Sequence, residues 1–137
     1  MAKGLGQDQK YWEALEDGRL ELPKCTKCGH WQWPAPYRCE KCGSWEFDWV
    51  EQPFEGTMFS WTRTPHPFDG AEQLGSPYTS VLVEIPTGGN IRLLGLMAPG
   101  EQPVIGQKVQ GKRITSHVYG RDIPAIQWSI QDTGAAA

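Results

Sequence analysis

Two C-x-x-C-G motifs constrain this chain more than any other feature. They are Cys25-Thr26-Lys27-Cys28-Gly29 and Cys39-Glu40-Lys41-Cys42-Gly43, with ten residues between Cys28 and Cys39. Four thiolates at this spacing can occupy the corners of one tetrahedron, which is the geometry of a closed structural zinc site. The glycine that ends each motif suits a position where the backbone takes a positive φ, because glycine does so without steric cost. The sequence therefore predicts a metal site formed by Cys25, Cys28, Cys39 and Cys42.

Other uses of the four cysteines fit the sequence less well. A disulfide framework needs an oxidising compartment, and residues 1–8 contain no apolar core of a signal peptide. A thioredoxin-like redox pair uses one C-x-x-C motif beside a βαβ pattern, and haem attachment needs His where Gly29 stands. Zinc is the expected metal, but iron in a rubredoxin-like site uses the same four ligands and stays an alternative.

Size and charge narrow the class of protein. At 137 residues and 39% hydrophobic content, the chain corresponds to one compact domain or two small modules, without a membrane span. The net charge of -3 argues against a nucleic-acid binder that relies on bulk electrostatic attraction. With no signal peptide and free thiols as metal ligands, a cytoplasmic location is expected. The seven tryptophans either supply core area or form a binding surface.

A short helix is predicted ahead of the first motif, over Gln9–Asp17. Asp8 is placed to cap its start and Gly18 to end it. Isolated helices below about 12 residues rarely persist in water, so this one must dock on its own domain or on a partner subunit, and both options stay open. The candidate contact residues form one apolar face: Tyr11, Trp12 and Leu15.

Short alternating segments surround the cysteine motifs. Arg19–Pro23 is predicted to be a strand that leads into the first motif, and Trp31–Trp33 a second one with both indoles on one face. Trp45, Phe47 and Trp49 repeat the alternation after the second motif. We expect these aromatic side chains to pack around the metal site and join it to the rest of the chain; stacking on nucleic-acid bases is the alternative.

From Gly56 onward the sequence changes to strands separated by Gly/Pro turns. A long loop over 64–77 is expected to be functional or to cover something. The predicted strands are Gly56–Arg63, Tyr78–Ile85, Ile91–Met97, Val109–Ile114 and Ala125–Ile130. Five such strands, some containing glycine where a sheet must bend, predict a small closed Greek-key barrel of the OB type.

The predicted fold class is therefore mainly β: a short N-terminal helix, a zinc ribbon and a five-stranded OB-fold Greek-key barrel. The expected divisions are the helix and lead-in strand (1–22), the zinc ribbon (23–52), the barrel (53–131) and a flexible tail (132–137).

Candidate residues for ligand binding and catalysis are few. Three histidines, His30, His66 and His117, lie outside any nucleophile motif, and the chain has no Gly-rich phosphate loop, so no catalytic residue is predicted. One basic cluster could contact a CoA pyrophosphate or a nucleic-acid backbone, or be an ordinary solvated face. Its members are Lys108, Lys112, Arg113, His117 and Arg121.

The chain as a whole resembles domain-of-unknown-function family thirty-five, a rubredoxin-like zinc ribbon fused to an OB-fold. The resemblance covers about Gln9 to Ile130, and it departs from the family pattern at Pro34-Ala35-Pro36 and Glu40. The residues that carry it, besides the two cysteine motifs, are Tyr11-Trp12, Leu15, Gly18-Arg19-Leu20, Leu22-Pro23, Pro34 and Ser44.

This resemblance implies an accessory subunit without turnover of its own. Members of the family accompany thiolase-superfamily enzymes that act on acyl-CoA thioesters, such as thiolases, acyl-CoA synthases and the lipid-transfer-type aldolases of steroid side-chain degradation. The expected partner is such a thiolase-superfamily or aldolase subunit, with acyl-CoA bound through the complex. A nucleic-acid-binding zinc-ribbon/OB module is the alternative function.

Overall fold

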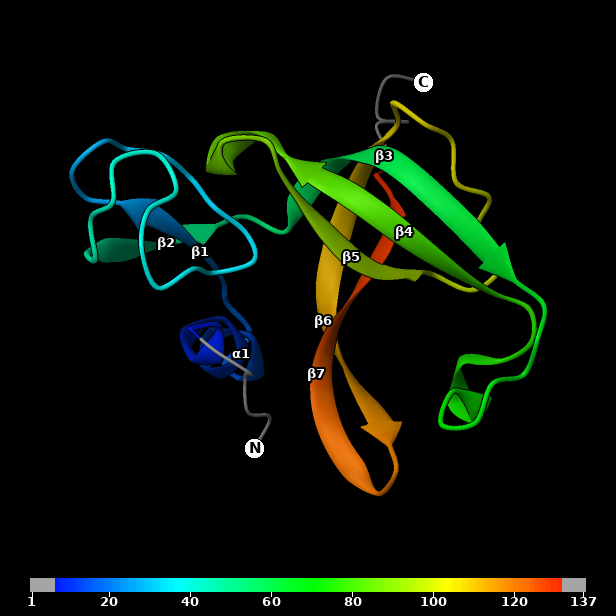
Figure 1. The fold of residues 1–137 in the computed structure, drawn as a ribbon. Coiled ribbons are helices and arrows are strands. Elements are labelled where there is room, and N and C mark those ends of the chain that lie inside the picture. Colours follow the sequence, from blue (N-terminus) through cyan, green and yellow to red (C-terminus); the bar gives the residue numbers. More distant parts are fainter. Residues whose placement is uncertain (1–6, 132–137) are drawn as a thin grey trace.

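The structure, a computed structural model, describes residues 7–131 and combines one helix, a two-stranded ribbon and a barrel (Figure 1). Helix α1 (Gln9–Glu16) leads into strand β1 (Leu20–Cys25), which pairs antiparallel with β2 (Phe47–Gln52). The two cysteine motifs lie in and between these strands. The expected division at residue 22 falls inside β1.

Five strands close the barrel in the order β3-β4-β5-β7-β6, with β6 pairing back to β3. All neighbours are antiparallel except β5 and β7, which run parallel. This order confirms the predicted five-stranded Greek-key barrel. The strands are β3 (Glu55–Thr64), β4 (Tyr78–Ile85), β5 (Ile91–Met97), β6 (Lys108–Val118) and β7 (Arg121–Ile130); short 3-10 turns are η1 (Glu72–Leu74) and η2 (Pro86–Gly88).

The barrel core is built around Trp128, which is fully buried. Two glycines within strands make room for its indole: a Cβ on Gly95 would lie 2.7 Å from the ring, and one on Gly111 would lie 3.0 Å from it. Alternate residues of β4 point into the same core, as the period of two in a strand requires. The glycines that the sequence placed inside strands therefore accommodate a large neighbouring side chain.

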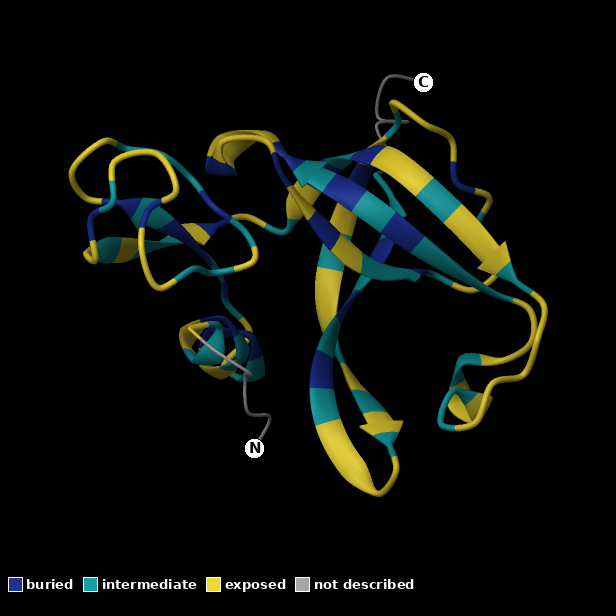
Figure 2. Ribbon diagram, in the orientation of Figure 1, coloured by how far each residue is buried: buried dark blue, intermediate teal, exposed yellow. Residues whose placement is uncertain are grey.

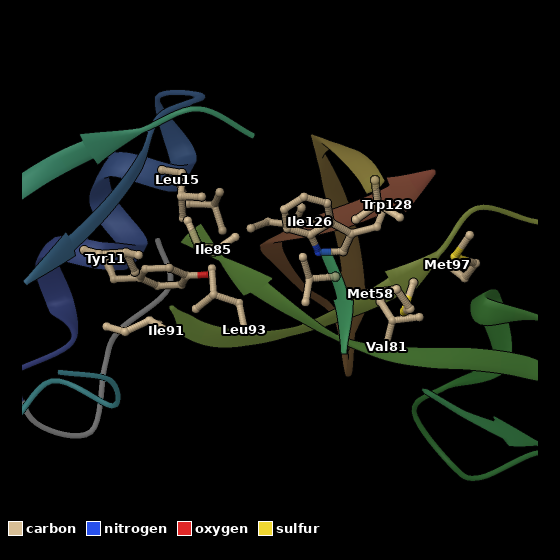
Figure 3. Close-up of a cluster of buried hydrophobic side chains, with 14 residues drawn as sticks. Tyr11, Leu15, Met58, Val81, Ile85, Ile91, Leu93, Met97, Ile126 and Trp128 are labelled. Carbon is tan, nitrogen blue, oxygen red and sulfur yellow. The ribbon is translucent and has the colours of Figure 1, made fainter. Parts of the chain in front are cut away.

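Helix α1 and the ribbon belong to this same core. Tyr11 and Leu15 from the helix, and Leu20 and Leu22 from β1, form one buried cluster with barrel side chains. Figure 3 shows the Tyr11 ring lying beside Ile91 and Leu93 of the barrel. The helix docks between β1 and β7, so the ribbon and barrel have no separate cores. Neither α1 nor the 3-10 turns in the described part are long and apolar enough to cross a membrane.

The turn between β4 and β5 forms the joint between barrel and ribbon. Gly89 has φ +69 and lies under Trp31, so that a Cβ there would be 2.3 Å from the indole ring. A Cβ on Gly88 would lie 2.8 Å from Leu22. The Thr87 hydroxyl donates a 2.6 Å hydrogen bond to the Gln52 side chain. The joint is therefore packed tightly enough to fix the ribbon against the barrel.

The start of the helix differs from the prediction in one respect. Asp8 occupies the N-cap position but makes no side-chain cap hydrogen bond. Its carboxylate instead accepts a 3.0 Å hydrogen bond from the Trp12 indole N–H. The helix ends at Glu16, one residue earlier than predicted.

The two aromatic segments near the cysteines are less regular than predicted. Residues 31–33 form no strand, only a single bridge between Trp31 and Lys24, because the adjacent prolines cannot extend a ladder. Trp45 lies ahead of β2 and is exposed.

Strands β6 and β7 extend well beyond the predicted segments. They continue as a hairpin whose turn carries two residues with positive φ, Tyr119 and Gly120. We call residues 112–127 the arm; its tip is exposed in Figure 2, and it projects past the rest of the barrel in Figure 1. Its polar stretch Thr115–His117 lacks the apolar alternation by which a strand is recognised in a sequence. The predicted flexible tail, 132–137, lies outside the described residues.

Candidate metal centre

The four predicted ligands converge at one end of the ribbon. All four sulfur atoms lie within 4.8 Å of one another. The Cys25 and Cys42 sulfurs are 3.5 Å apart, as are those of Cys28 and Cys39. Sulfur ligands about 2.3 Å from a tetrahedral metal are separated by about 3.8 Å. The cluster therefore fits a tetrahedral metal ion with little adjustment.

Each cysteine motif is a tight backbone turn closed by its glycine. The Gly29 N–H donates to the Cys25 carbonyl at 3.0 Å, and the Gly43 N–H donates to the Cys39 carbonyl at 2.9 Å. Both glycines have positive φ, at +75 and +79. These are the conformations for which the sequence required glycine.

A buried glutamine supports the centre and was missed at the level of sequence. Gln32 is 5% exposed, and its side-chain NH₂ donates to the Cys39 sulfur at 3.1 Å. Its side-chain oxygen accepts from the Glu40 backbone N–H at 3.2 Å. One side chain thus orients a ligand and holds the turn that carries it. The only signal in the sequence is a polar residue between two tryptophans, which by itself does not indicate a contact with a cysteine.

The four sulfurs perturb one another's pKa values. Burial alone would raise the pKa of Cys39, but the backbone N–H groups of Cys42 and Lys41 and the neighbouring thiols outweigh it and lower the pKa to about 6. The His30 backbone N–H lowers the pKa of Cys28, yet burial and the neighbouring sulfurs raise it to about 12. The pKa values of Cys28 and Cys39 shift in opposite directions because four adjacent thiolates repel one another, so that they cannot all be anionic without a cation. A cation between them removes this conflict.

The residues predicted to contact a partner are divided by the structure. Tyr11 and Leu15 are buried in the protein's own core. Tyr11 packs against Trp33, with ring centroids 4.4 Å apart. Trp12 is half-buried and leaves part of its ring at the surface. The helix therefore docks on its own domain, and Trp12 is the one member of the predicted set that a partner could still contact.

The basic cluster does not form one patch. In the β6–β7 ladder, Lys112 lies opposite Gln127, whereas Arg113 lies opposite Ile126, whose side chain is buried in the core. Because successive side chains of a strand point to opposite faces, the cluster is split into two sets. Lys108, Lys112 and Arg121 share the outer face, and Arg113 and His117 lie on the other.

The histidines lie in three separate surface environments. His30 contacts Glu40 at 2.9 Å, and His117 contacts Asp122. The His66 ring packs against Phe68, with centroids 4.5 Å apart. Within residues 7–131, no hydrogen bond joins a histidine side chain to a serine or cysteine side chain.

A protein-family model matches the ribbon, whereas solved structures match the ribbon and the barrel together. Residues 12–48 match the family described as "ChsH2, rubredoxin-like zinc ribbon domain". Comparison with curated protein sequences gives no match.

Two solved structures share the whole architecture. The structure described as "Ltp2-ChsH2(DUF35) aldolase" superposes with a TM-score of 0.77 at 25% identity, over 95% of this chain and 98% of that one. A DUF35-family protein of unknown function from Sulfolobus solfataricus superposes with a TM-score of 0.59 at 21% identity, over 92% of this chain and 87% of that one. At this identity the second match shows the fold alone. Residues 12–48 thus match a ChsH2-type rubredoxin-like ribbon, the four cysteines form a metal-binding site, and the resemblance of the whole chain to DUF35 proteins is confirmed.

Proposed function

We propose that this protein is a non-catalytic accessory subunit that binds and stabilises a thiolase-superfamily enzyme acting on an acyl-CoA. The partner would be a thiolase, an acyl-CoA synthase or a lipid-transfer-type aldolase of steroid side-chain degradation. The observation that carries the proposal is the match over 95% of the chain to a protein of the two-component Ltp2-ChsH2(DUF35) aldolase. Acyl-CoA would be bound in the complex, and the location would be the cytoplasm.

The metal centre supports a structural role. Zinc is the proposed ion, held by Cys25, Cys28, Cys39 and Cys42. Four thiolate ligands leave no open coordination position for a substrate or a reactive water. The ion would link the two cysteine motifs and contribute folding free energy, with no step of chemistry assigned to it.

Purification from the native cell tests the proposal. The tagged full chain is isolated and proteins present in stoichiometric amount are identified by mass spectrometry. We expect a thiolase-fold protein. That protein, expressed without this chain, should be insoluble, unstable or inactive, and co-expression should restore its activity. A partner that is fully active alone would contradict the proposal, and so would recovery of DNA- or RNA-processing proteins in its place.

Trp12 gives a second test of the same proposal. Trp12→Ala should weaken association with the thiolase-fold partner while the barrel remains folded. Trp45→Ala is a useful control, because Trp45 is an exposed tryptophan beside the second cysteine motif and not on α1. Equal effects of the two substitutions on affinity would remove α1 from the proposed interface.

A further inference from the structure

A groove of about 550 Å³ lies between the arm and the long loop after β3. Residues 96–102 line the groove, and so do Leu74 and Pro77 of the long loop. At the outer end the Tyr119 hydroxyl of the arm donates to the Asp69 carbonyl at 3.1 Å, and the ring lies against Gly70. The arm and the loop are therefore held at a fixed separation around the groove.

One face of the arm forms a wall of this groove. Ile114, Ser116 and Gln127 of this face line the groove, together with Thr115 between the first two. By strand alternation and pairing, the same face carries five more residues: Lys112, Val118, Arg121, Ile123 and Ala125. This face is apolar in its middle, basic at both ends and free of carboxylates.

Arg63 lines the groove, and Lys112 and Arg121 lie on the same arm face beyond the residues that line it. Within the described part of the chain, Arg63, Lys112 and Arg121 take part in no ion pair. The Glu101 carboxylate, which also lines the groove, accepts the Ile130 backbone N–H at 2.7 Å. Unpaired cations along an apolar wall, in a chain of net charge -3, are complementary to an anionic ligand.

The spacing of the two arm cations identifies the kind of ligand. Arg121 lies opposite Val118, which is six positions along β6 from Lys112. At about 3.3 Å per residue, the two cations are about 20 Å apart along the face. A single phosphate group cannot contact both, and CoA carries its phosphates at one end. An extended peptide of about six residues with acidic groups at both ends spans this distance.

We propose that the groove binds an extended acidic and apolar segment of the partner subunit. The inference rests on the proposed function, since it names where and by what chemistry the partner is held. The arm is a two-stranded hairpin beyond the barrel, and such hairpins are marginally stable alone, so a bound segment would also stabilise it.

Charge reversal on the two faces of the arm tests the proposal. Lys112→Glu and Arg121→Glu should each weaken binding to the co-purified partner by about tenfold or more, with the loss diminishing at high salt. Arg113→Glu is the matched control: it is adjacent in sequence, equally basic and on the opposite face. Thermal melting of each variant excludes unfolding as the cause. Equal affinities for all three variants and the wild type would overturn the inference while leaving the proposed function intact.

Cross-linking identifies the ligand in the groove. A photoreactive amino acid at position 116 of the full chain should cross-link, in the complex, to a partner peptide that contains Asp or Glu beside apolar residues. Cross-linking to a second copy of this chain, or none at all, would contradict the proposal. So would normal assembly of the Lys112→Glu complex with a raised KM for an acyl-CoA substrate, since the groove would then hold a small anionic ligand. If the wild-type chain had no partner, the proposed function itself would be wrong.

Discussion

The amide of Gln32 connects a sulfur ligand to the backbone of the second cysteine motif. A neutral donor at 3.1 Å stabilises the thiolate form of Cys39 without adding charge, and the amide oxygen fixes the adjacent turn. Outer-shell residues of this kind orient the ligands before the ion arrives.

Gln32→Ala should therefore weaken metal binding. The expected loss of affinity is about 10-fold to 100-fold, the range for removal of such a supporting contact. Competition with a chromophoric chelator measures it, with the metal identified by elemental analysis. His30→Ala serves as control, because the His30 side chain contacts Glu40 and no sulfur. Unchanged affinity in Gln32→Ala would mean that backbone donors alone orient Cys39.

Tyr11 makes the stability of the fold sensitive to alkaline pH. Burial raises the pKa of its phenol from 10.0 to about 12. Below pH 10 the folded and unfolded states both hold the proton. Between pH 10 and 12 only the unfolded state loses it, so stability falls as pH rises, by roughly 3 kcal/mol in total.

Tyr11→Phe should remove this part of the pH dependence. The substitution keeps the ring in the core, so stability near neutral pH should change little. The difference in unfolding free energy between wild type and variant, from urea titrations followed by tryptophan fluorescence, should grow above pH 10 in favour of the variant. Parallel curves for the two proteins up to pH 12 would show that the phenol is solvated in the folded state.

At the scale of elements, the turn at Gly88 and Gly89 determines how ribbon and barrel meet. Gly89→Ala combines two penalties: a left-handed conformation, which costs a non-glycine residue about 1–2 kcal/mol, and overlap with Trp31, which adds about 1–3 kcal/mol. Gly100→Ala is the control: it has only the conformational penalty, because φ is +82 at Gly100 and no atom lies within 4 Å of the added Cβ. Chemical denaturation should show a larger loss for Gly89→Ala. Equal losses would mean that Trp31 moves aside at little cost.

Elements with regular apolar alternation were predicted well, and those without it were not. Tyr78–Ile85 was found because alternate Val and Ile side chains face the core. The arm was missed because Ser116 and His117 carry no such pattern, and its apolar face becomes visible only when Ile114 and Ile123 are brought together by pairing. The metal ligands follow from local spacing, whereas Gln32 depends on the folded path of the chain between the motifs. Lys112 and Arg113 are neighbours in the sequence and were predicted to belong to one basic cluster. Successive side chains of a strand point to opposite faces, so the two lie on different faces of β6.

At the scale of the whole molecule, ribbon and barrel should unfold together. They share the cluster that contains Leu22 of β1 and Ile85 of β4, so the ribbon has no apolar core separate from that of the barrel. Small domains that bury little surface depend on such sharing.

Loss of the metal should therefore destabilise the barrel as well. Cys42→Ser, or treatment of the wild type with a chelator, should lower the melting temperature of the entire protein in one calorimetric transition and abolish partner binding. Lys41→Ala, next to the ligand, controls for surface changes in the same turn. Two separate transitions, with the melting temperature of the barrel unchanged by loss of the metal, would show that ribbon and barrel are energetically independent.

The docking of α1 on β7 also has a consequence for biosynthesis. Tyr11 is synthesised before any strand of the barrel, whereas Ile126 and Trp128, which belong to the same buried cluster, lie on β7, the last barrel strand along the chain. Domains synthesised from the N-terminus expose apolar surface until their late contacts form. The nascent chain must therefore carry an uncovered aromatic helix until β7 has been made, and an interrupted chain lacking β7 would be a substrate for chaperones and proteases.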